Sequence, residues 1–182
     1  MVRSISSHSI APASVLRGDG AWDEALPQIK SLCSRPLVLG RSASTADQRK
    51  LLVLDLQAKG LNPLQAQLQF DCCEQDLQRV AVEAKGCDAV LAAGGGKVLD
   101  AGKLLAHRLS LPCVTVPLSA STCAGWTALS NIYSPQGAFE GDVPWIVAPM
   151  YLFLTMAWCA RRLRAPWPVV SLMPWPSGTK PQ

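Results

Sequence analysis

The sequence predicts an α/β fold in which a parallel sheet carries helices on its faces. Short apolar segments of the kind found in buried strands alternate with amphipathic helical segments along the chain. Glycines follow several of these segments, as they do at Gly40, Gly60 and Gly86. A glycine-rich turn at residues 94–96 separates a strand pattern from a helix pattern, which is where ligands bind in parallel α/β sheets.

Each element follows from its own pattern. Apolar residues recur at helical spacing in four segments, which predict helices over 22–33, 45–59, 74–85 and 97–109. Thr45 is the expected N-cap of the second of these helices. Four apolar or alternating runs are typical of strands: 36–40, 64–70, 88–93 and 111–117. A β-hairpin is expected over 129–140, with its turn at 134–137.

The turn Gly94-Gly95-Gly96-Lys97 has the chemistry of a phosphate site. Glycines let the backbone approach a phosphate closely, the helix N-terminus offers unpaired N–H groups, and Lys97 adds a full positive charge. The spacing matches neither GxGxxG nor the P-loop motif, and a tight turn without a ligand would have the same residues. Residues 119–129 form a hydroxyl-rich loop that would suit either a ribose or nicotinamide contact or a polar surface turn.

Charge is unevenly distributed along the chain. The formal net charge is +4, and all of it comes from residues 143–182, which hold four basic residues and no acidic one. Residues 1–142 hold 13 basic and 13 acidic residues and are neutral. The basic excess therefore does not indicate a nucleic-acid partner.

Seven cysteines are scattered along the chain without a CxxC pair or a metal-ligand spacing to His8 or His107. The first twenty residues are rich in serine and lack a long apolar run, so no secretory signal is expected. Scattered thiols without such a signal predict a cytoplasmic location, with the cysteines serving as small buried apolar side chains.

The residues from Ala92 onward resemble a known family. The run AAGGGKVLDAGKLLAHRLSLPCVTVPLSASTCAGWTALSNIYSPQGAFEG is similar to the glycerol dehydrogenase branch of the iron-containing alcohol dehydrogenase superfamily. That branch shows GGGKxxDxxK, then VPTxAST, TSALSVIY and a G-x-F hairpin. An earlier GxG turn (Gly18, Gly20) and the PLVLG strand agree, so the resemblance covers roughly residues 12–142. The dehydroquinate synthase and glycerol-1-phosphate dehydrogenase branches share the fold but fit these motifs less well.

The resemblance implies a Rossmann-like NAD(P)-binding domain over residues 1–142. It assigns the diphosphate of NAD or NADP to Gly94, Gly95, Gly96, Lys97 and Val98. It assigns the nicotinamide and ribose to a second set of residues: Leu118, Ser121, Thr127, Leu129 and Tyr133. The substrate would be a small alcohol or polyol, with no nucleic-acid or membrane partner, and a homo-oligomer stays open for the intact family.

The sequence departs from the family pattern at three places. Gly40-Arg41 stands where the family often has an Asp that contacts the adenosine ribose, so NADP stays open beside NAD. Cys123 replaces the substrate-contacting Asp of the STDAP segment, which puts glycerol itself in doubt. Leu118 replaces the Thr of the VPT segment.

The second half of the family is an all-helical domain that supplies a divalent metal, Zn or Fe, through one Asp and two His. In the parent reaction that metal lowers the pKa of the substrate hydroxyl, and the nicotinamide accepts a hydride. Residues 143–182 resemble nothing in that domain, so the chain is expected to be a truncated dehydrogenase without metal ligands, with residual or no cofactor binding and no catalysis.

The irregular tail, residues 143–182, is consistent with out-of-frame translation. The tail can be back-translated with the genetic code and its bases regrouped, so that each new codon joins the third base of one codon to the first two bases of the next. In this frame the bases of Trp145-Ile146 can encode only an Asp, and those of Met150-Tyr151 only a Val. The permitted string there is Pro-Asp-Val-x-Val-x-Asp, similar to the family's NPDLVLVDT. Further on, synonymous codons can be chosen so that the regrouped bases encode Gly-Ile-Ala-Asp-Ala-Leu-Ala-Lys-Trp-Tyr-Glu-Ala, a string similar to the family's metal-site helix. A net one-base deletion near Val143 would produce this offset.

Two other functions stay open. Residues 143–160 are apolar and are followed by Arg161 and Arg162, which resembles a tail anchor in a membrane, although Pro144 and Pro149 interrupt the segment. A free-standing nucleotide-binding or regulatory module would need no metal domain at all. Solubility on fractionation and tight cofactor binding by monodisperse protein distinguish these alternatives.

Overall fold

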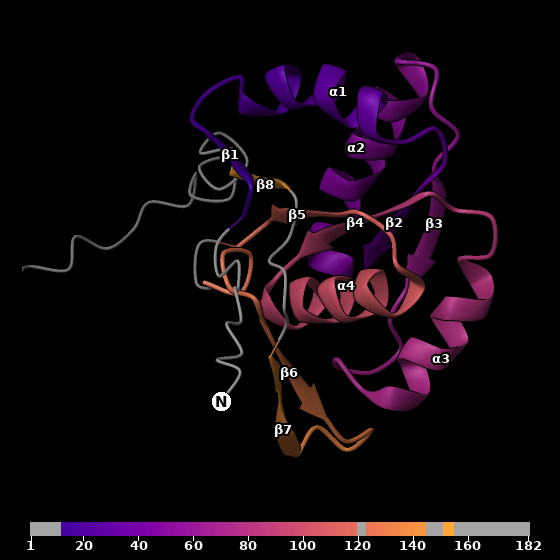
Figure 1. The fold of residues 1–182 in the computed structure, drawn as a ribbon, viewed down its shortest axis with the longest axis vertical. Helices are drawn as coiled ribbons and strands as arrows, with labels where there is room; N and C mark the ends of the chain where they lie inside the picture. Colours follow the sequence, from indigo (N-terminus) through magenta and orange to yellow (C-terminus); the bar gives the residue numbers. More distant parts are fainter. Residues whose placement is uncertain (1–11, 120–122, 145–150, 155–182) are drawn as a thin grey trace, which may run out of the picture.

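A six-stranded parallel sheet lies at the centre of the chain, with helices on both faces (Figure 1). The structure is a computed structural model that describes residues 12–119, 123–144 and 151–154. The strand order is β1-β8-β5-β4-β2-β3. The strands are β1 (Ser14–Arg17), β2 (Pro36–Gly40), β3 (Leu64–Gln67), β4 (Ala89–Gly94), β5 (Cys113–Pro117) and β8 (Tyr151–Leu154). The predicted α/β fold with a parallel sheet is confirmed.

The helices connect successive strands. They are α1 (Ala21–Leu32), the 3-10 turn η1 (Ala43–Thr45), α2 (Ala46–Ala58), α3 (Glu74–Glu83) and α4 (Gly96–Leu109). Each predicted helix is present, and its ends differ from the expected ones by no more than two residues, as fraying of terminal turns allows. Thr45 is the N-cap of α2, although its side chain makes no capping hydrogen bond.

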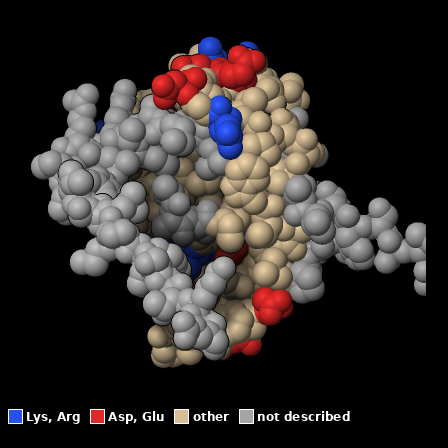
Figure 2. Space-filling model, turned by 90° about the vertical axis from the view of Figure 1, so that its left-hand side faces the viewer, with Lys and Arg blue, Asp and Glu red and all other residues tan. Residues whose placement is uncertain are grey.

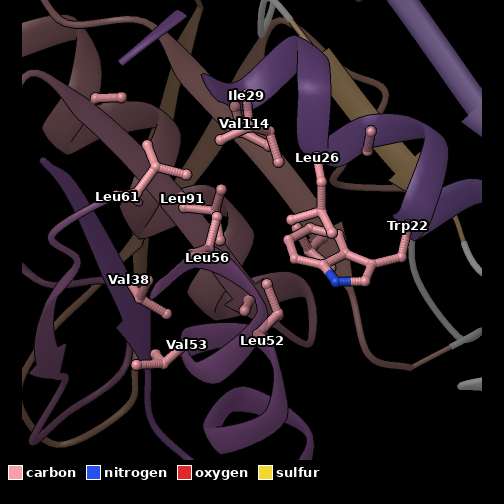
Figure 3. Close-up of a cluster of buried hydrophobic side chains, with 14 of the residues drawn as sticks. Trp22, Leu26, Ile29, Val38, Leu52, Val53, Leu56, Leu61, Leu91 and Val114 are labelled. Carbon is pink, nitrogen blue, oxygen red and sulfur yellow. The ribbon is translucent and has the colours of Figure 1, made fainter. Parts of the chain in front are cut away.

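One hydrophobic cluster packs α1 and α2 against one face of the sheet (Figure 3). Trp22, Leu26 and Ile29 lie one helical turn apart on α1 and share that buried face with Leu52 and Leu56 of α2. The cluster also takes alternate residues from the central strands: Val38, Ala89, Leu91, Ala93, Val114 and Val116. This alternation is what a strand with helices on both faces requires.

A second cluster packs α3 and α4 against the opposite face of the sheet. Gly102 brings α4 close to β4, because a Cβ atom at this position would overlap the Cβ of Ala92 and lie 3.4 Å from its Cα. The close approach fixes α4 directly beside the strand whose end carries the glycine-rich turn.

The predicted hairpin is confirmed as β6 (Leu129–Tyr133) paired antiparallel with β7 (Phe139–Pro144). Its pairing register shifts between Ile132 and Tyr133. Ser130 donates a hydrogen bond to the backbone carbonyl of Asp100 at 2.9 Å, which attaches the hairpin to α4.

Three features differ from the sequence-based expectation. The sequence predicts neither β1 nor β8, which pair in parallel with each other, and β8 also pairs with β5. Since β8 covers Tyr151–Leu154, this part of the tail expected to be irregular forms a strand. The strand expected over 64–70 ends at Gln67. The rest of the predicted tail, including residues 145–150 and 155–182, lies outside the described residues.

Most of the cysteines behave as expected. Cys33, Cys72, Cys73, Cys87 and Cys113 are buried and free, whereas Cys123 is exposed. Burial raises the pKa of the Cys33, Cys72 and Cys113 thiols to about 12. No helix in the described ranges combines the length and the apolar character needed to cross a membrane.

Candidate functional site

The carboxyl ends of β2, β3, β4 and β5 lie at one edge of the sheet because these strands are parallel. The loop after each strand therefore contributes to the same region of the molecule. Arg41 follows β2, Asp71 follows β3, and the glycine-rich turn follows β4. The hairpin strand β6 closes the region from the side, since Tyr133 donates a backbone hydrogen bond to the carbonyl of Cys72 at 2.8 Å.

The turn between β4 and α4 leaves open space above it. Gly94 packs on Val98, because a Cβ atom at position 94 would lie 2.9 Å from the Val98 Cβ. Gly95 is different: its φ of −83° and ψ of −178° suit any residue, and a Cβ there would meet nothing within 4 Å. The fold alone therefore does not require glycine at position 95.

Position 95 is also the N-cap of α4, and no side chain caps this helix. Among the first-turn N–H groups, that of Val98 donates to the carbonyl of Gly95 at 3.0 Å, whereas those of Gly96 and Lys97 have no acceptor one turn back in the helix. These two groups and the positive end of the helix dipole are available to an anion. The open space at Gly95 is where such an anion would approach the backbone. The turn thus fits a phosphate or diphosphate group.

A cavity of about 230 Å³ lies beside the start of α4. Its lining joins α4 to the loop before β6 and to β6 itself: Gly96, Lys97, Asp100, Cys123, Ala124, Thr127, Leu129, Asn131 and Tyr133. Six of the residues that the sequence singled out therefore meet around one cavity: Gly96, Lys97, Cys123, Thr127, Leu129 and Tyr133.

The other predicted residues lie elsewhere. Val98 is buried under Gly94, and Leu118 is 1% exposed in the cluster shared with α1 and α2. The Leu118 amide donates to the carbonyl of Gly94 at 2.9 Å, so Leu118 supports the turn without lining the cavity. Ser121 lies outside the described residues.

Lys97 projects from the helix start between two partners. Its ammonium group lies 4.6 Å from the centre of the Tyr133 ring and pairs with the carboxylate of Asp71. The other oxygen of Asp71 pairs with Arg41, so a single carboxylate joins cations from the β2 and β4 ends. Asp71 is 8% exposed, whereas the Lys97 side chain is 46% exposed and remains accessible to a ligand.

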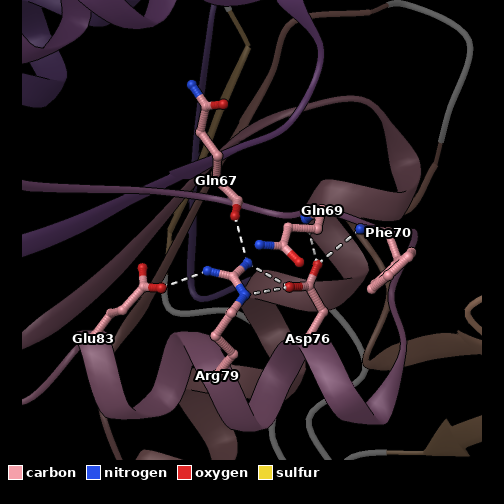
Figure 4. Close-up of polar contacts among 6 residues, drawn as sticks. All are labelled: Gln67, Gln69, Phe70, Asp76, Arg79 and Glu83. Carbon is pink, nitrogen blue, oxygen red and sulfur yellow. Dashed lines mark hydrogen bonds and ion pairs between the residues drawn. The ribbon is translucent and has the colours of Figure 1, made fainter.

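A hydrogen-bond network around the buried Asp76 holds the loop that carries Asp71 (Figure 4). The carboxylate of Asp76 accepts hydrogen bonds from the amides of Gln69 and Phe70, at 2.6 and 3.0 Å. Arg79 pairs with the other oxygen of Asp76 and donates to the carbonyl of Gln67 at 2.7 Å. These contacts end β3 and fix the backbone that leads into Asp71.

A buried ion pair on α4 supports the far wall of the cavity. Lys103 lies 3.0 Å from the carboxylate of Asp100, and both side chains are less than a tenth exposed. Lys103 also donates to the backbone carbonyls of Thr127 and Leu129, the first at 3.0 Å. Burial raises the pKa of Asp100 above its usual value, although Lys103 opposes the shift. The pair therefore fixes two cavity-lining residues to α4.

Sequence reasoning assigned no role to Asp71, Asp100 or Lys103. For Asp100 and Lys103 an indication was available, because an acid and a base three residues apart on the apolar side of a helix predict a buried pair. For Asp71 the chain offers no local pattern, because its two partners come from distant loops.

The described residues do not fit a metal. No group of three or more His, Cys, Asp or Glu side chains comes together within the described ranges. Charged side chains also form no large basic patch in Figure 2, where acidic and basic groups are interspersed at the upper end of the visible described surface. The geometry at this edge of the sheet suits an organic anion held by backbone amides and Lys97.

Comparison with known proteins agrees with this geometry. The model of the family described as iron-containing alcohol dehydrogenase matches residues 12–142. An uncharacterised oxidoreductase of Synechocystis is 42% identical over 145 residues, which cover 79% of this chain and 37% of that protein. A glycerol dehydrogenase of Escherichia coli is 30% identical over 132 residues, covering 71% and 36% of the two chains.

A solved structure shares the fold. The glycerol dehydrogenase of Schizosaccharomyces pombe superimposes with a TM-score of 0.75 at 21% identity, over 87% of this chain and 41% of that one. The chain thus spans less than half the length of these relatives.

Proposed function

Because the chain belongs to the iron-containing alcohol dehydrogenase family, we propose that residues 1–142 form the NAD(P)-binding domain of an alcohol or polyol dehydrogenase. The observation that carries the proposal is Gly95, whose backbone conformation does not require glycine and whose missing side chain leaves space for a diphosphate. The matched residues, 12–142, include this turn.

Within this proposal the residues have distinct roles. The turn from Gly94 to Val98 holds the diphosphate through the amides of Gly96 and Lys97, and the Lys97 side chain balances its negative charge. Thr127, Leu129 and Tyr133, together with Ser121, position the nicotinamide and its ribose, and Leu118 acts indirectly by supporting the turn through its amide. When bound, the cofactor accepts a hydride from the alcohol. The Asp100–Lys103 pair keeps Thr127 and Leu129 at a fixed distance from the helix start.

The substrate class follows from the relatives and from Cys123. Relatives of this chain carry the name glycerol dehydrogenase, which favours a small hydroxylated substrate. Cys123 lies at the cavity, where it offers a thiol in place of the carboxylate implied by the resemblance. A thiol is a weak hydrogen-bond partner, so a substrate with fewer hydroxyl groups than glycerol is favoured.

We also propose that the 182-residue chain, expressed as printed, binds cofactor without oxidising alcohols. The described residues hold no cluster suited to a divalent metal, so no catalytic step through a metal is assigned to them. The buried, free thiols support a cytoplasmic location for the chain.

The proposal for residues 143–182 is out-of-frame translation. In the alternative frame the Met150–Tyr151 junction forces a Val and the Leu152–Phe153 junction permits one, and β8 lies over Tyr151–Leu154. Both frames are therefore compatible with apolar residues at the position where a strand enters the sheet between β1 and β5. Resequencing the DNA tests this: the absence of a family helix in the other frame of a verified sequence would overturn it.

Cofactor titration tests the proposed function. Energy transfer from tryptophan to the nicotinamide of NADH or NADPH is measured while the full chain is titrated, and saturable transfer is expected with at least one of the two. No transfer at millimolar cofactor, with the chain soluble and folded by circular dichroism, would contradict the proposal. Restoring the frame and assaying alcohols with Zn²⁺ or Fe²⁺ then tests the dehydrogenase activity.

A stand-alone nucleotide-binding module is the second candidate. Two observations favour it: the turn at the start of α4 suits a nucleotide phosphate, and the described part of the chain has no cluster of metal-ligating side chains. Tight cofactor binding by a verified, unshifted gene product that lacks alcohol oxidation would favour this module over the dehydrogenase.

A further inference from the structure

We propose that Asp71 is a positioning residue for the dinucleotide: its carboxylate holds the ammonium group of Lys97 at the start of α4, where the diphosphate binds. This inference rests on the proposed cofactor function and adds to it a residue that acts through Lys97. A carboxylate close to an anion site would repel the anion by its charge alone. The inference therefore predicts an effect of Asp71 on cofactor affinity that is opposite in sign to the effect of its charge.

The backbone is held in place on both sides of Asp71. On one side, the amide of Phe70 donates to the buried carboxylate of Asp76 at 3.0 Å (Figure 4). On the other side, the carbonyl of Cys72, a buried residue, accepts a hydrogen bond from the amide of Tyr133 at 2.8 Å. The Asp71 carboxylate is therefore a fixed point between the end of β3 and the hairpin.

The carboxylate itself is covered. Asp71 is 8% exposed, and its two oxygens are paired, one with Arg41 and the other with Lys97. The hairpin turn comes close as well, since a Cβ atom at Gly137 would lie 3.8 Å from the oxygen that pairs with Lys97. Little of the carboxylate surface is left for a ligand, so its influence on a ligand passes through the two cations.

Lys97 benefits from such an anchor because its side chain is long and 46% exposed. Lysine is among the side chains that lose the most rotamer freedom when they are fixed. The Asp71 carboxylate and the Tyr133 ring, whose centre lies 4.6 Å from the Lys97 Nζ, hold it before any ligand arrives. An ammonium group has three N–H donors, so the pairing with Asp71 leaves donors for phosphate oxygens. A ligand that meets a side chain already in place binds more tightly.

The charges at this edge of the sheet explain why positioning outweighs repulsion. Two cations, Arg41 and Lys97, share the one carboxylate, which leaves a net positive charge around Asp71. Without the Lys97 ammonium there is nothing to position, and only the negative charge of Asp71 acts on the diphosphate. Removal of the Asp71 charge should then strengthen cofactor binding, or leave it unchanged where Arg41 offsets that charge.

The test is a double-mutant cycle on the full chain. NADH and NADPH are titrated with energy transfer from tryptophan as the signal, and the cofactor that the unsubstituted chain binds more tightly is followed. Asp71→Asn keeps the size of the side chain and removes its charge. It should weaken binding roughly 2- to 12-fold, the range for one side chain that the ligand must immobilise. In the Lys97→Ala chain, the same substitution should leave the affinity unchanged or raise it.

Two results of the cycle overturn the inference. Equal or tighter cofactor binding in Asp71→Asn alone would show that the carboxylate acts on the cofactor only through its charge. A loss of the same size with and without the Lys97 side chain would show that Asp71 supports the fold and does not act through Lys97.

Glu83→Gln is the matched control. It also removes one carboxylate from an ion pair, with Arg79, but this pair lies on the surface of α3 and lines neither the cavity nor the glycine-rich turn. It is expected to leave cofactor affinity unchanged. A loss as large as that in Asp71→Asn would assign the effect to net charge and overturn the positioning role.

The unsubstituted chain gives a second measurement, which holds even if Asp71→Asn does not fold. In nuclear magnetic resonance spectra, the Lys97 ammonium nitrogen is expected to show a scalar coupling to the Asp71 carboxylate carbon across their hydrogen bond, both without and with bound cofactor. Loss of the coupling on cofactor binding would show that the diphosphate displaces Asp71, which would overturn the inference.

Failure of the inference differs from failure of the proposed function. When the unsubstituted chain binds cofactor and the cycle gives either of the two contrary results, the positioning role of Asp71 alone is overturned. The absence of binding by both NADH and NADPH in the unsubstituted chain overturns the cofactor function and this inference together.

Discussion

The substitution Gly95→Ala separates the structural and functional demands on the glycine-rich turn. The backbone at position 95 has a φ of −83° and a ψ of −178°, which alanine adopts without strain. The added Cβ would meet no protein atom within 4 Å. It would stand in the open space above the first turn of α4, where the diphosphate is proposed to contact the backbone.

Two opposing effects decide the stability of this variant. Alanine reduces the conformational entropy of the unfolded chain, which stabilises a protein by about 0.4–1 kcal/mol at a compatible position. Glycine is a better N-cap residue than alanine, and losing it costs a comparable amount, about 0.5–1 kcal/mol. The net change in the free energy of unfolding is therefore within about 0.5 kcal/mol, and Tm should move by about 2 °C or less.

Cofactor binding is expected to respond much more strongly. The diphosphate contacts backbone N–H groups, so a methyl group between them forces the phosphate outward and weakens more than one charge-assisted hydrogen bond. Losing about 1.5–3 kcal/mol corresponds to a roughly 10- to 150-fold weaker affinity. Fluorescence titration with NADPH measures the affinity, and thermal unfolding measures the stability.

Gly102→Ala is the control on the same helix. Its Cβ would overlap Ala92, so this variant should lose about 1–3 kcal/mol of stability from overpacking rather than specifically lose affinity. The reasoning would be refuted if Gly95→Ala bound NADPH as tightly as the parent chain. A loss of stability in Gly95→Ala as large as that in Gly102→Ala would refute it as well.

Two further predictions concern buried groups. Lys103→Met leaves Asp100 buried without its ion-pair partner and should lower the free energy of unfolding by about 3–5 kcal/mol, measured by urea unfolding. Adding Asp100→Asn should restore part of that loss. Equal stability of the single and the double variant would contradict the buried pair. The thiol pKa values of Cys33, Cys72 and Cys113 are raised from 9.0 to about 12, so their stabilising effect is complete below pH 9 and is lost as the pH rises toward 12. At pH 10 each thiol should cost about 1.4 kcal/mol relative to pH 8, and Cys72→Ala should show a correspondingly smaller pH dependence in urea unfolding. An unchanged pH dependence in that variant would contradict the account.

Hydrophobic periodicity predicts the helices and strands that are defined by residues close together in the sequence. The run Pro36–Gly40 is apolar throughout and ends in glycine, and the structure has a strand over the same residues. Val114, Val116 and Leu118 alternate along β5 and just beyond its end, and all three lie in the cluster shared with α1 and α2. The resemblance placed Leu118 near the cofactor, and its backbone contact with Gly94 is consistent with a position beside the turn.

The remaining features depend on contacts between distant residues. β1 has four partly exposed or exposed residues and no clear alternation, and it becomes a strand by pairing with β8, far along the chain. β3 ends early because the Asp76 carboxylate captures the amides of Gln69 and Phe70. The overlap of Arg49 with the space above Gly40 likewise depends on how α2 folds back on β2, which no local pattern reveals.

The measurement that tests the central claim most directly is the change in backbone amide chemical shifts of the full chain on addition of NADPH. The account predicts the largest changes at the turn from Gly94 to Val98, with further changes at Arg41 and around Thr127 and Tyr133. Saturable binding with the largest changes elsewhere in the described residues, and none at Gly95 or Gly96, would contradict a cofactor site at the β4–α4 turn.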